Sequence, residues 1–150
     1  MISRAVHRKT RAALVGAAAL GLAFSAGSGA AQATPAGPGV VGKVISQRTV
    51  DGTDYILRDI TIPPGQSTGW HVHDGPLYGV VLRGTLSHFD ASCASDGVYR
   101  AGDPVTERRG AGTHIGRNLG TEPMVLRVLY VLPHGAPFSQ DAANPGCDFQ

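Results

Sequence analysis

From Val40 onward the sequence is divided into short runs rich in β-branched and aromatic residues, and glycine, proline or aspartate stands between the runs. Such runs are typical of β-strands, and no stretch with a helical period of useful length follows residue 33. Asp51 and Gly52 form a hairpin-turn signal between the first two runs. The pattern therefore predicts an all-β sandwich or barrel with strands at 41–50, 55–62, 69–73, 78–82, 85–89, 98–100, 113–117 and 124–132.

Three histidines stand where strands can bring them to one point. His71 and His73 are two residues apart, so their side chains leave a strand on the same face, and His114 lies in another predicted strand. Neutral imidazole is the commonest protein ligand for divalent transition metals, so the set predicts a metal site with open positions. The alternative interpretation is a pair of surface histidines on an edge strand.

The segments that carry these histidines resemble the two conserved motifs of the cupins. Residues 65–84 are similar to the first motif, in which a glycine precedes His-x-His and a second glycine closes a turn. Residues 102–118 are similar to the second motif, in which a glycine precedes a histidine that is followed by an asparagine. The matching positions outside the His-x-His pair are Gly84, Gly102, His114 and Asn118.

This resemblance spans residues 40–135 and implies a single-domain cupin-type β-barrel, also called a double-stranded β-helix or jelly roll. It also implies a divalent metal ion, which would be iron, manganese, zinc, nickel or copper. The ligands would be His71, His73 and His114.

Two positions depart from the cupin pattern. The glutamate that completes the family's ligand set should fall at Leu77 or Tyr78, and neither residue is a carboxylate. The Pro-x-Gly of the second motif is replaced by Arg109, Gly110 and Ala111. We therefore expect a site of three neutral nitrogens, in which the missing carboxylate weakens metal affinity without abolishing binding.

Four further residues are candidates for the surroundings of this site. Tyr78 is predicted to pack near the metal or to hydrogen-bond a ligand, and His88 to line the barrel. Asn118 is predicted to stabilise a turn through its side-chain amide. Trp70 is predicted to lie in the core rather than to form a platform for substrate. Glu107 and the neighbouring arginines are interpreted as solvated loop charges, together with an exposed His134.

The first 33 residues have the features of a secretory signal peptide. A basic stretch is followed by an apolar run at residues 12–24, and Ala31 and Ala33 are small residues suited to signal peptidase. The run is too short for a comfortable membrane span, so we expect no membrane anchor after cleavage. Export to the extracellular space follows from this interpretation. Residues 34–39 are rich in proline and glycine and are predicted to form a flexible segment.

Cleavage changes the electrostatic interpretation of the chain. Four of the 13 lysines and arginines lie in the signal and none of the 11 acidic residues does, so the exported chain has a net charge of about −2 (9 minus 11). The basicity of the precursor therefore predicts export and not nucleic-acid binding.

Cys93 and Cys147 are the two cysteines of the chain. In an oxidising compartment such a pair favours a disulfide, which would tie an irregular C-terminal tail at residues 136–150 to the loop around residues 90–97.

Three functions remain open at this point. The first is a secreted metal-binding cupin with an unassigned oxygenase or isomerase-type activity. The second is a non-catalytic module that binds a small ligand, and the third is a structural barrel with an empty histidine site. Whether the protein is an enzyme is undecided. A homodimer is compatible with the resemblance, and the chain contains no nucleophile elbow or phosphate loop.

Overall fold

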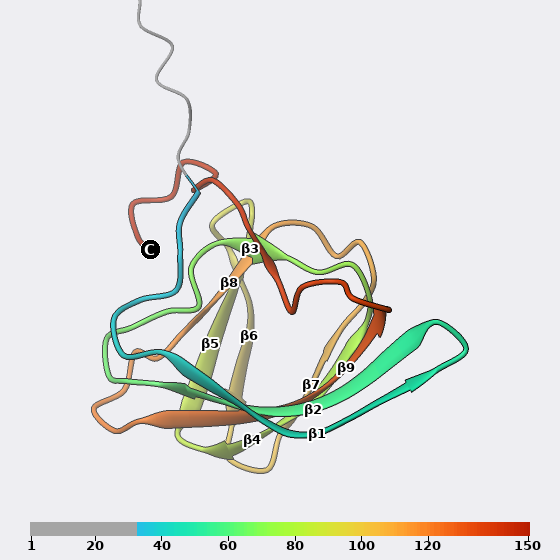
Figure 1. Cartoon of the computed structure of the whole chain (residues 1–150). Coiled ribbons are helices and arrows are strands. Elements are labelled where there is room, and N and C mark those ends of the chain that lie inside the picture. Colours follow the sequence, from blue (N-terminus) through green and yellow to red (C-terminus); the bar gives the residue numbers. More distant parts are fainter. Residues whose placement is uncertain (1–32) are drawn as a thin grey trace, which may run out of the picture.

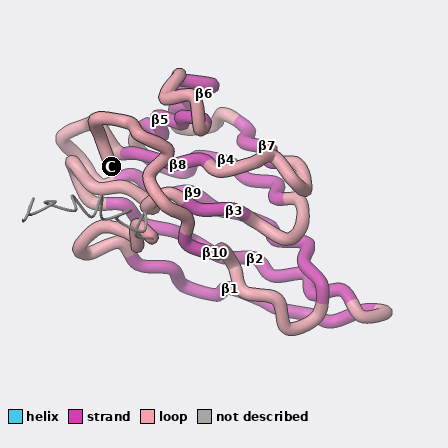
Figure 2. Tube along the Cα trace, turned by 90° about the horizontal axis from the view of Figure 1, so that it is seen from above, coloured by secondary structure: helices cyan, strands magenta, loops and turns pink. Residues whose placement is uncertain are grey.

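The computed structural model describes residues 33–150, so the predicted signal peptide, apart from Ala33, lies outside the described residues. Ten strands form two five-stranded sheets that face each other across a common interior (Figure 1). The described part of the chain contains strands and loops and no helix (Figure 2). Consequently, within residues 33–150, no helix is long and apolar enough to cross a membrane.

The first sheet has the strand order β1-β2-β9-β4-β7, and all neighbours are antiparallel. Asp51 and Gly52 join β1 to β2 with φ angles of 47° and 75°, as the favoured two-residue hairpin turn requires. The strands are β1 (Val41–Val50), β2 (Thr53–Ile62), β9 (Met124–Pro133), β4 (Leu77–Arg83) and β7 (Pro104–Glu107).

The second sheet has the order β10-β3-β8-β5-β6 and is also antiparallel. Its strands are β10 (Gln140–Asp141), β3 (His71–Val72), β8 (His114–Arg117), β5 (Thr85–Asp90) and β6 (Ser95–Arg100). The sequence predicted eight of the ten strands and missed β7 and β10.

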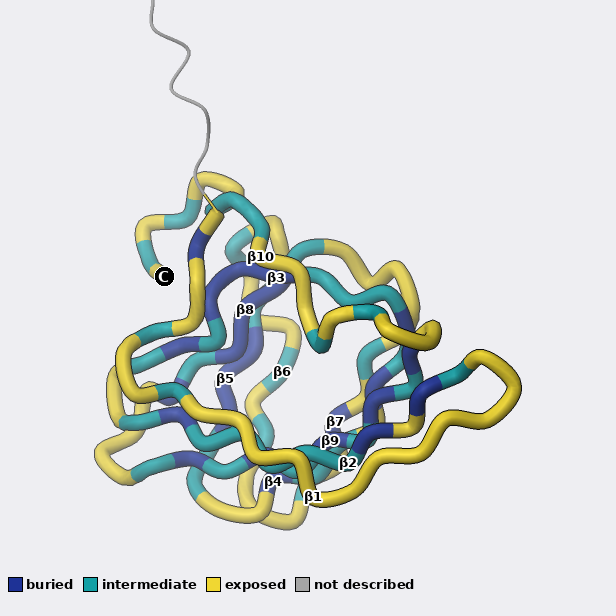
Figure 3. Tube along the Cα trace, viewed as in Figure 1, coloured by how far each residue is buried: buried dark blue, intermediate teal, exposed yellow. Residues whose placement is uncertain are grey.

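The hydrophobic core fills the space between the sheets. Alternate residues of β9 are buried, as expected for a strand with one face inward, whereas every residue of β1 is exposed at the outer edge (Figure 3). The buried cluster comprises Ile56, Ile62, Leu77, Val81, Leu86, Val105, Met124, Leu126, Val128, Tyr130 and Leu132.

The segment at residues 34–39, for which the sequence predicted flexibility, makes hydrogen bonds to the barrel. Thr34 donates its backbone N–H to the carbonyl of Ala142 at 2.9 Å and accepts the N–H of Trp70 at its side-chain oxygen at 2.8 Å. Gly37 donates its N–H to the carbonyl of Ser67 at 2.9 Å. These partners come from distant parts of the chain, so the local Pro/Gly-rich composition could not indicate them.

The C-terminal tail folds back over the second sheet. It is irregular apart from β10, which pairs with β3. The structure contains the predicted disulfide between Cys93 and Cys147, whose Cα atoms are 5.6 Å apart. Near the end of the tail, the ring of Phe149 packs against Trp70 and Phe89, with centroid distances of 5.9 and 4.8 Å.

Candidate metal centre

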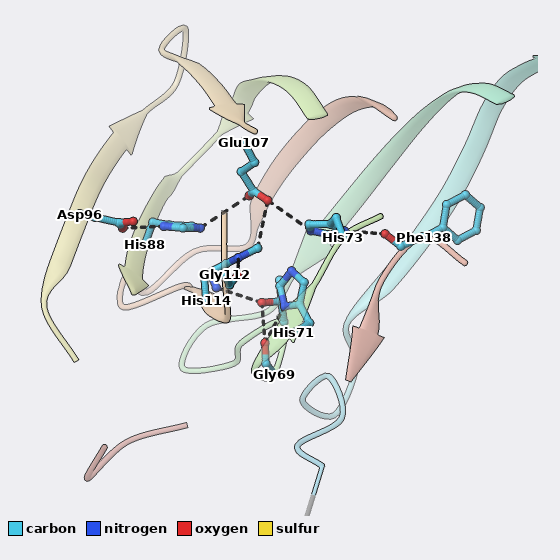
Figure 4. A network of polar contacts seen from close by, with 11 residues as sticks. Gly69, His71, His73, His88, Asp96, Glu107, Gly112, His114 and Phe138 are labelled. Atoms are coloured by element: carbon cyan, nitrogen blue, oxygen red, sulfur yellow. Dashed lines mark hydrogen bonds and ion pairs between the residues drawn. The ribbon is translucent and has the colours of Figure 1, made fainter. Parts of the chain in front are cut away.

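Two adjacent strands bring the three predicted histidines together at one end of the interior. His71 on β3 lies directly opposite His114 on β8, and His73 follows β3 on the same face as His71. One ring nitrogen from each of the three residues lies within 4.8 Å of those from the other two (Figure 4). The same-face spacing of the His-x-His pair thus has the geometric result that the sequence indicated.

Each of these imidazoles is oriented by a hydrogen bond at its Nδ1 atom. A backbone carbonyl can only accept, so the Nδ1 atom that faces it carries the proton and Nε2 keeps its lone pair. Such carbonyl contacts orient histidines in metal sites. For His71, His73 and His114 the carbonyls belong to Gly69, Phe138 and Gly112, at 2.8, 2.6 and 2.9 Å.

Glu107 places a carboxylate among the three histidines, which neither Leu77 nor Tyr78 can provide. Its Oε2 atom lies 3.0 Å from Nε2 of His114 and 3.2 Å from Nε2 of His73, and its side chain is only 14% exposed. The interpretation of Glu107 as a solvated loop charge is therefore wrong. Glu107 ends β7 directly opposite Leu77 on β4, and paired residues project on the same face of a sheet.

Acceptor atoms consequently face one another across this centre. The lone pairs on the Nε2 atoms point toward a carboxylate, which is stable only with a proton or a metal cation between them. Two ligands at about 2.1 Å from one ion are separated by about 3.0–3.4 Å, which agrees with the distances from Glu107 to the imidazoles. Oε2 of Glu107 and Nε2 of His114 are buried and have no hydrogen-bond partner within residues 33–150.

His88 lies beside this set and is also buried. Its Nδ1 atom is 2.6 Å from a carboxylate oxygen of Asp96, and its Nε2 atom is 3.6 Å from Oε1 of Glu107. His88, Glu107 and His114 form a second group with metal-ligand spacing. His114 belongs to both groups, and its Nδ1 atom is hydrogen-bonded to a carbonyl. Its Nε2 atom can therefore bind an ion in one group or in the other, but not in both at once. The prediction that His88 lines the interior agrees with this placement.

The pKa values in the cluster are set by burial and by contacts between the charged groups. Burial lowers the pKa of His71 to about 3, assisted by repulsion from the protonated forms of His114 and His73. Burial alone would raise the pKa of Glu107, but its close approach to the imidazoles of His114, His73 and His88, when these are protonated, outweighs burial and holds the pKa of the carboxyl far below its usual range. For His88, contacts with Glu107 and Asp96 outweigh burial and raise the pKa. A buried carboxylate among imidazoles favours a cation.

The remaining candidate residues do not touch the centre. Tyr78 is 52% exposed and points away from the interior, because it alternates with the inward-facing Leu77, so its predicted role near the metal is wrong. Trp70 is fully buried against the tail. Asn118 stabilises a turn, as predicted: its amide donates to the carbonyls of Ile62 and Glu122 at 2.9 and 2.8 Å.

Comparison with solved structures identifies the architecture. A double-stranded β-helix protein from Klebsiella pneumoniae matches with a TM-score of 0.56 at 21% identity, over 72% of this chain and 88% of that one. A cupin domain from Bordetella pertussis matches with a TM-score of 0.53 at 21% identity, over 63% and 94% of the two chains. The chain has the cupin fold. A cupin-like protein from Thermotoga maritima is similar as well, with a TM-score of 0.56 at 18% identity over 70% and 77%.

No family model matches the sequence, and no curated protein matches it. The cupin likeness therefore concerns the fold, and the chemistry of the site rests on the residues themselves. Glu107 is the residue that sequence reasoning missed. The signal was the alternation of Val105 and Glu107 after Pro104, which places both side chains on one face of a short strand.

Proposed function

We propose that this protein binds one divalent transition-metal ion through His71, His73, His114 and Glu107. The observation that carries the proposal is the orientation of the three imidazoles: each Nδ1 atom is hydrogen-bonded to a backbone carbonyl, which leaves Nε2 as the ligand atom. Three imidazoles and one carboxylate suit zinc, iron, manganese, nickel or copper. A bound ion would act as a Lewis acid on a ligand at an open position.

The compartment forms the second part of the proposal. The features of residues 1–33 and the disulfide in the structure both favour an exported protein. We propose that the folded domain works outside the cytoplasm, where the bridge between Cys93 and Cys147 remains oxidised. Recovery of the chain from the medium, shortened at its N-terminus, tests this part by mass spectrometry.

Metal titration of the purified protein tests the centre. Metal-free protein is titrated by calorimetry with Zn²⁺, Mn²⁺, Ni²⁺ and Cu²⁺, and with Fe²⁺ without oxygen. We expect one ion per chain, and His114→Ala should weaken binding by at least about a hundredfold, since it removes a direct ligand. His134→Ala is the matched control, because His134 is a surface histidine whose ring contacts Asp54. Equal affinity of His114→Ala and the parent protein would contradict the proposal.

Catalysis needs a separate measurement. Oxygen uptake by the metal-loaded protein with small organic acids distinguishes an oxygenase from a non-catalytic binding module. Uptake that disappears in His114→Ala and persists in His134→Ala would support an enzyme.

A further inference from the structure

Arg58 occupies an inward-facing position of β2. Residues of a strand alternate between its two faces, so Arg58 lies on the same face as Ile56, Ile60 and Ile62. Ile56 and Ile62 are core residues, and Ile60 packs against them. A guanidinium in an otherwise apolar row is unfavourable unless something compensates its charge.

No carboxylate compensates Arg58 within residues 33–150. Two arginines of the described residues do have acidic partners: Arg83 pairs with Glu122 at 3.0 Å, and Arg127 binds Asp59 at 2.7 and 2.8 Å. Arg58 forms no ion pair in the described part of the chain, and its Nε atom is buried without a hydrogen-bond partner. An unsatisfied buried donor of this kind is a ready site for an acceptor from outside the chain.

The fold holds the guanidinium in a defined place. Its Cζ atom lies 4.3 Å from the centroid of the Phe138 ring, on the tail segment that also supplies the carbonyl for His73. Gly42 on β1 makes room for it, because a Cβ atom at that position would overlap the guanidinium. Arg58 also lies close enough to Tyr130 to oppose the rise in the pKa of that phenol caused by burial.

Arg58 borders a groove that leads to the metal centre. This groove has a volume of about 160 Å³, and its walls include Arg58, Tyr130, Thr68, His71 and His73. Apart from the two histidines, Arg58 is the only charged side chain among its walls. A second opening, of about 350 Å³, is lined by acidic and basic residues together, namely Asp90, Asp96, Arg108 and Arg109, and so selects no sign of charge.

We propose that the Arg58 groove binds the carboxylate group of a small organic acid. The guanidinium would pair with the carboxylate through two parallel N–H···O bonds, and the remainder of the acid would lie toward His71 and His73. A single guanidinium matches the single charge of a carboxylate better than the double charge of a phosphate. The inference rests on the proposed metal centre for the orientation of the acid, while the Arg58 contact itself does not require the ion.

A nuclear magnetic resonance titration of the metal-free and zinc-loaded protein tests this site. The probe is butanoate, with butanamide as the neutral molecule of similar shape, and the reporter is the Nε–H signal of Arg58. We expect butanoate to shift this signal with saturation and butanamide to leave it unchanged. Equal binding of butanoate and butanamide, or tighter binding of inorganic phosphate, would overturn the assignment.

Three variants make the test specific. Arg58→Met should weaken butanoate binding at least tenfold, followed through backbone signals around Thr68 and Tyr130, and Arg108→Met at the other opening should not change it. Gly42→Ala keeps the charge but displaces the guanidinium, so it should also weaken binding. Zinc affinity of all three variants should equal that of the parent protein, which shows that they fold. Butanoate binding by a protein that takes up no metal would reject the proposed function and retain this inference; unchanged binding by Arg58→Met would reject the inference alone.

Discussion

At the scale of single residues, the candidate centre shows that two paired positions on neighbouring strands can direct a side chain to the same point of the interior. Leu77 and Glu107 face each other across β4 and β7, and both side chains point into the interior. A carboxylate from either strand can therefore approach the same imidazoles. The centre receives its negative charge if either Leu77 or Glu107 is replaced by, or already is, an acidic residue.

This equivalence predicts the outcome of an exchange. Glu107→Leu should weaken metal binding, because it removes the negative ligand from a poorly hydrated cavity. Adding Leu77→Glu to that variant should restore most of the affinity, whereas adding Tyr78→Glu should not, because Tyr78 points to solvent. Calorimetric titration of the three proteins at one pH measures this. Restoration by the Tyr78 variant, or by neither, would show that the two inward positions are not equivalent.

His71 and His73 were predictable from the sequence because their geometry is local: strand periodicity alone places them on one face. His114 was predicted from the resemblance of residues 102–118 to the second cupin motif, and in the structure it pairs directly with His71. Glu107 was not predictable in this way, since its role depends on the register between β4 and β7. Tyr78 was predicted to face the site, but successive side chains of a strand point in opposite directions. Leu77 faces the interior, and its neighbour Tyr78 therefore faces solvent.

Asp54 is a second buried carboxylate, with a structural role at the β1–β2 hairpin. Its oxygens accept hydrogen bonds from the hydroxyl of Thr49 at 2.6 Å, the N–H of Gly135 at 3.0 Å and the ring of His134 at 3.0 Å. The Thr49 hydroxyl is the largest cause that lowers the pKa of Asp54 to about 2, followed by the contacts of Gly135 and His134. The carboxylate thus joins the hairpin to the end of β9.

This shift predicts an acid sensitivity. The unfolded chain binds the proton near the ordinary value of 3.8 and the folded chain near 2, so the contribution of Asp54 to stability is complete above pH 4 and is lost as the pH falls toward 2. Asp54→Asn should be less stable than the parent at pH 6 and should lose less stability between pH 4 and pH 2. Urea denaturation at several pH values measures both slopes. Parallel slopes would contradict the assignment of this titration to Asp54.

At the scale of elements, every strand of six or more residues was predicted, and two of the four shorter strands, β7 and β10, were missed. β9 has ten residues with strict alternation of burial, and its pattern was visible in the sequence. β7 and β10 have four and two residues, and such segments become strands because a neighbouring strand pairs with them. β10 lies in the tail that composition marked as irregular, and it completes the second sheet next to β3.

The β1–β2 hairpin offers a test of turn chemistry. Gly52 has a φ of 75°, and a Cβ atom there would meet no other atom within 4 Å. Gly52→Ala should therefore destabilise the protein by about 1 kcal/mol through backbone conformation alone, with no clash. Ser46→Ala, on the exposed strand β1, is the control and should be nearly neutral. The midpoint of urea denaturation measures the difference, and an unchanged midpoint for Gly52→Ala would contradict it.

At the scale of the whole molecule, the tail is part of the candidate centre and not an appendage. Phe138 supplies the carbonyl that orients His73, and β10 lies beside His71. The tail is joined to the barrel at the Cys93–Cys147 bridge and at Thr34, which binds Ala142. The oxidation state of the Cys93–Cys147 pair and the metal affinity of the centre should therefore be coupled.

Removal of the disulfide tests this coupling. The bridge closes a loop with a sequence separation of 54 residues. In the loop-entropy model its removal by Cys93→Ser and Cys147→Ser together costs about 4 kcal/mol, which should lower the thermal midpoint. Metal affinity should fall by about tenfold as the carbonyl of Phe138 becomes less well placed. Calorimetry on the parent protein with and without reductant is the control. Equal metal affinity in all forms would show that the tail positions His73 without help from the bridge.

The contacts between the tail and the barrel also determine when the centre can form during synthesis. A ribosome adds residues from the N-terminus onward, so a nascent chain already contains His71, His73 and His114 before Phe138 exists. Until the tail arrives, His73 has no acceptor at Nδ1, β3 lacks its outer neighbour and Trp70 has no Phe149 to pack against. The arrangement of the candidate centre is thus completed only by residues that are synthesised after all three of its histidines.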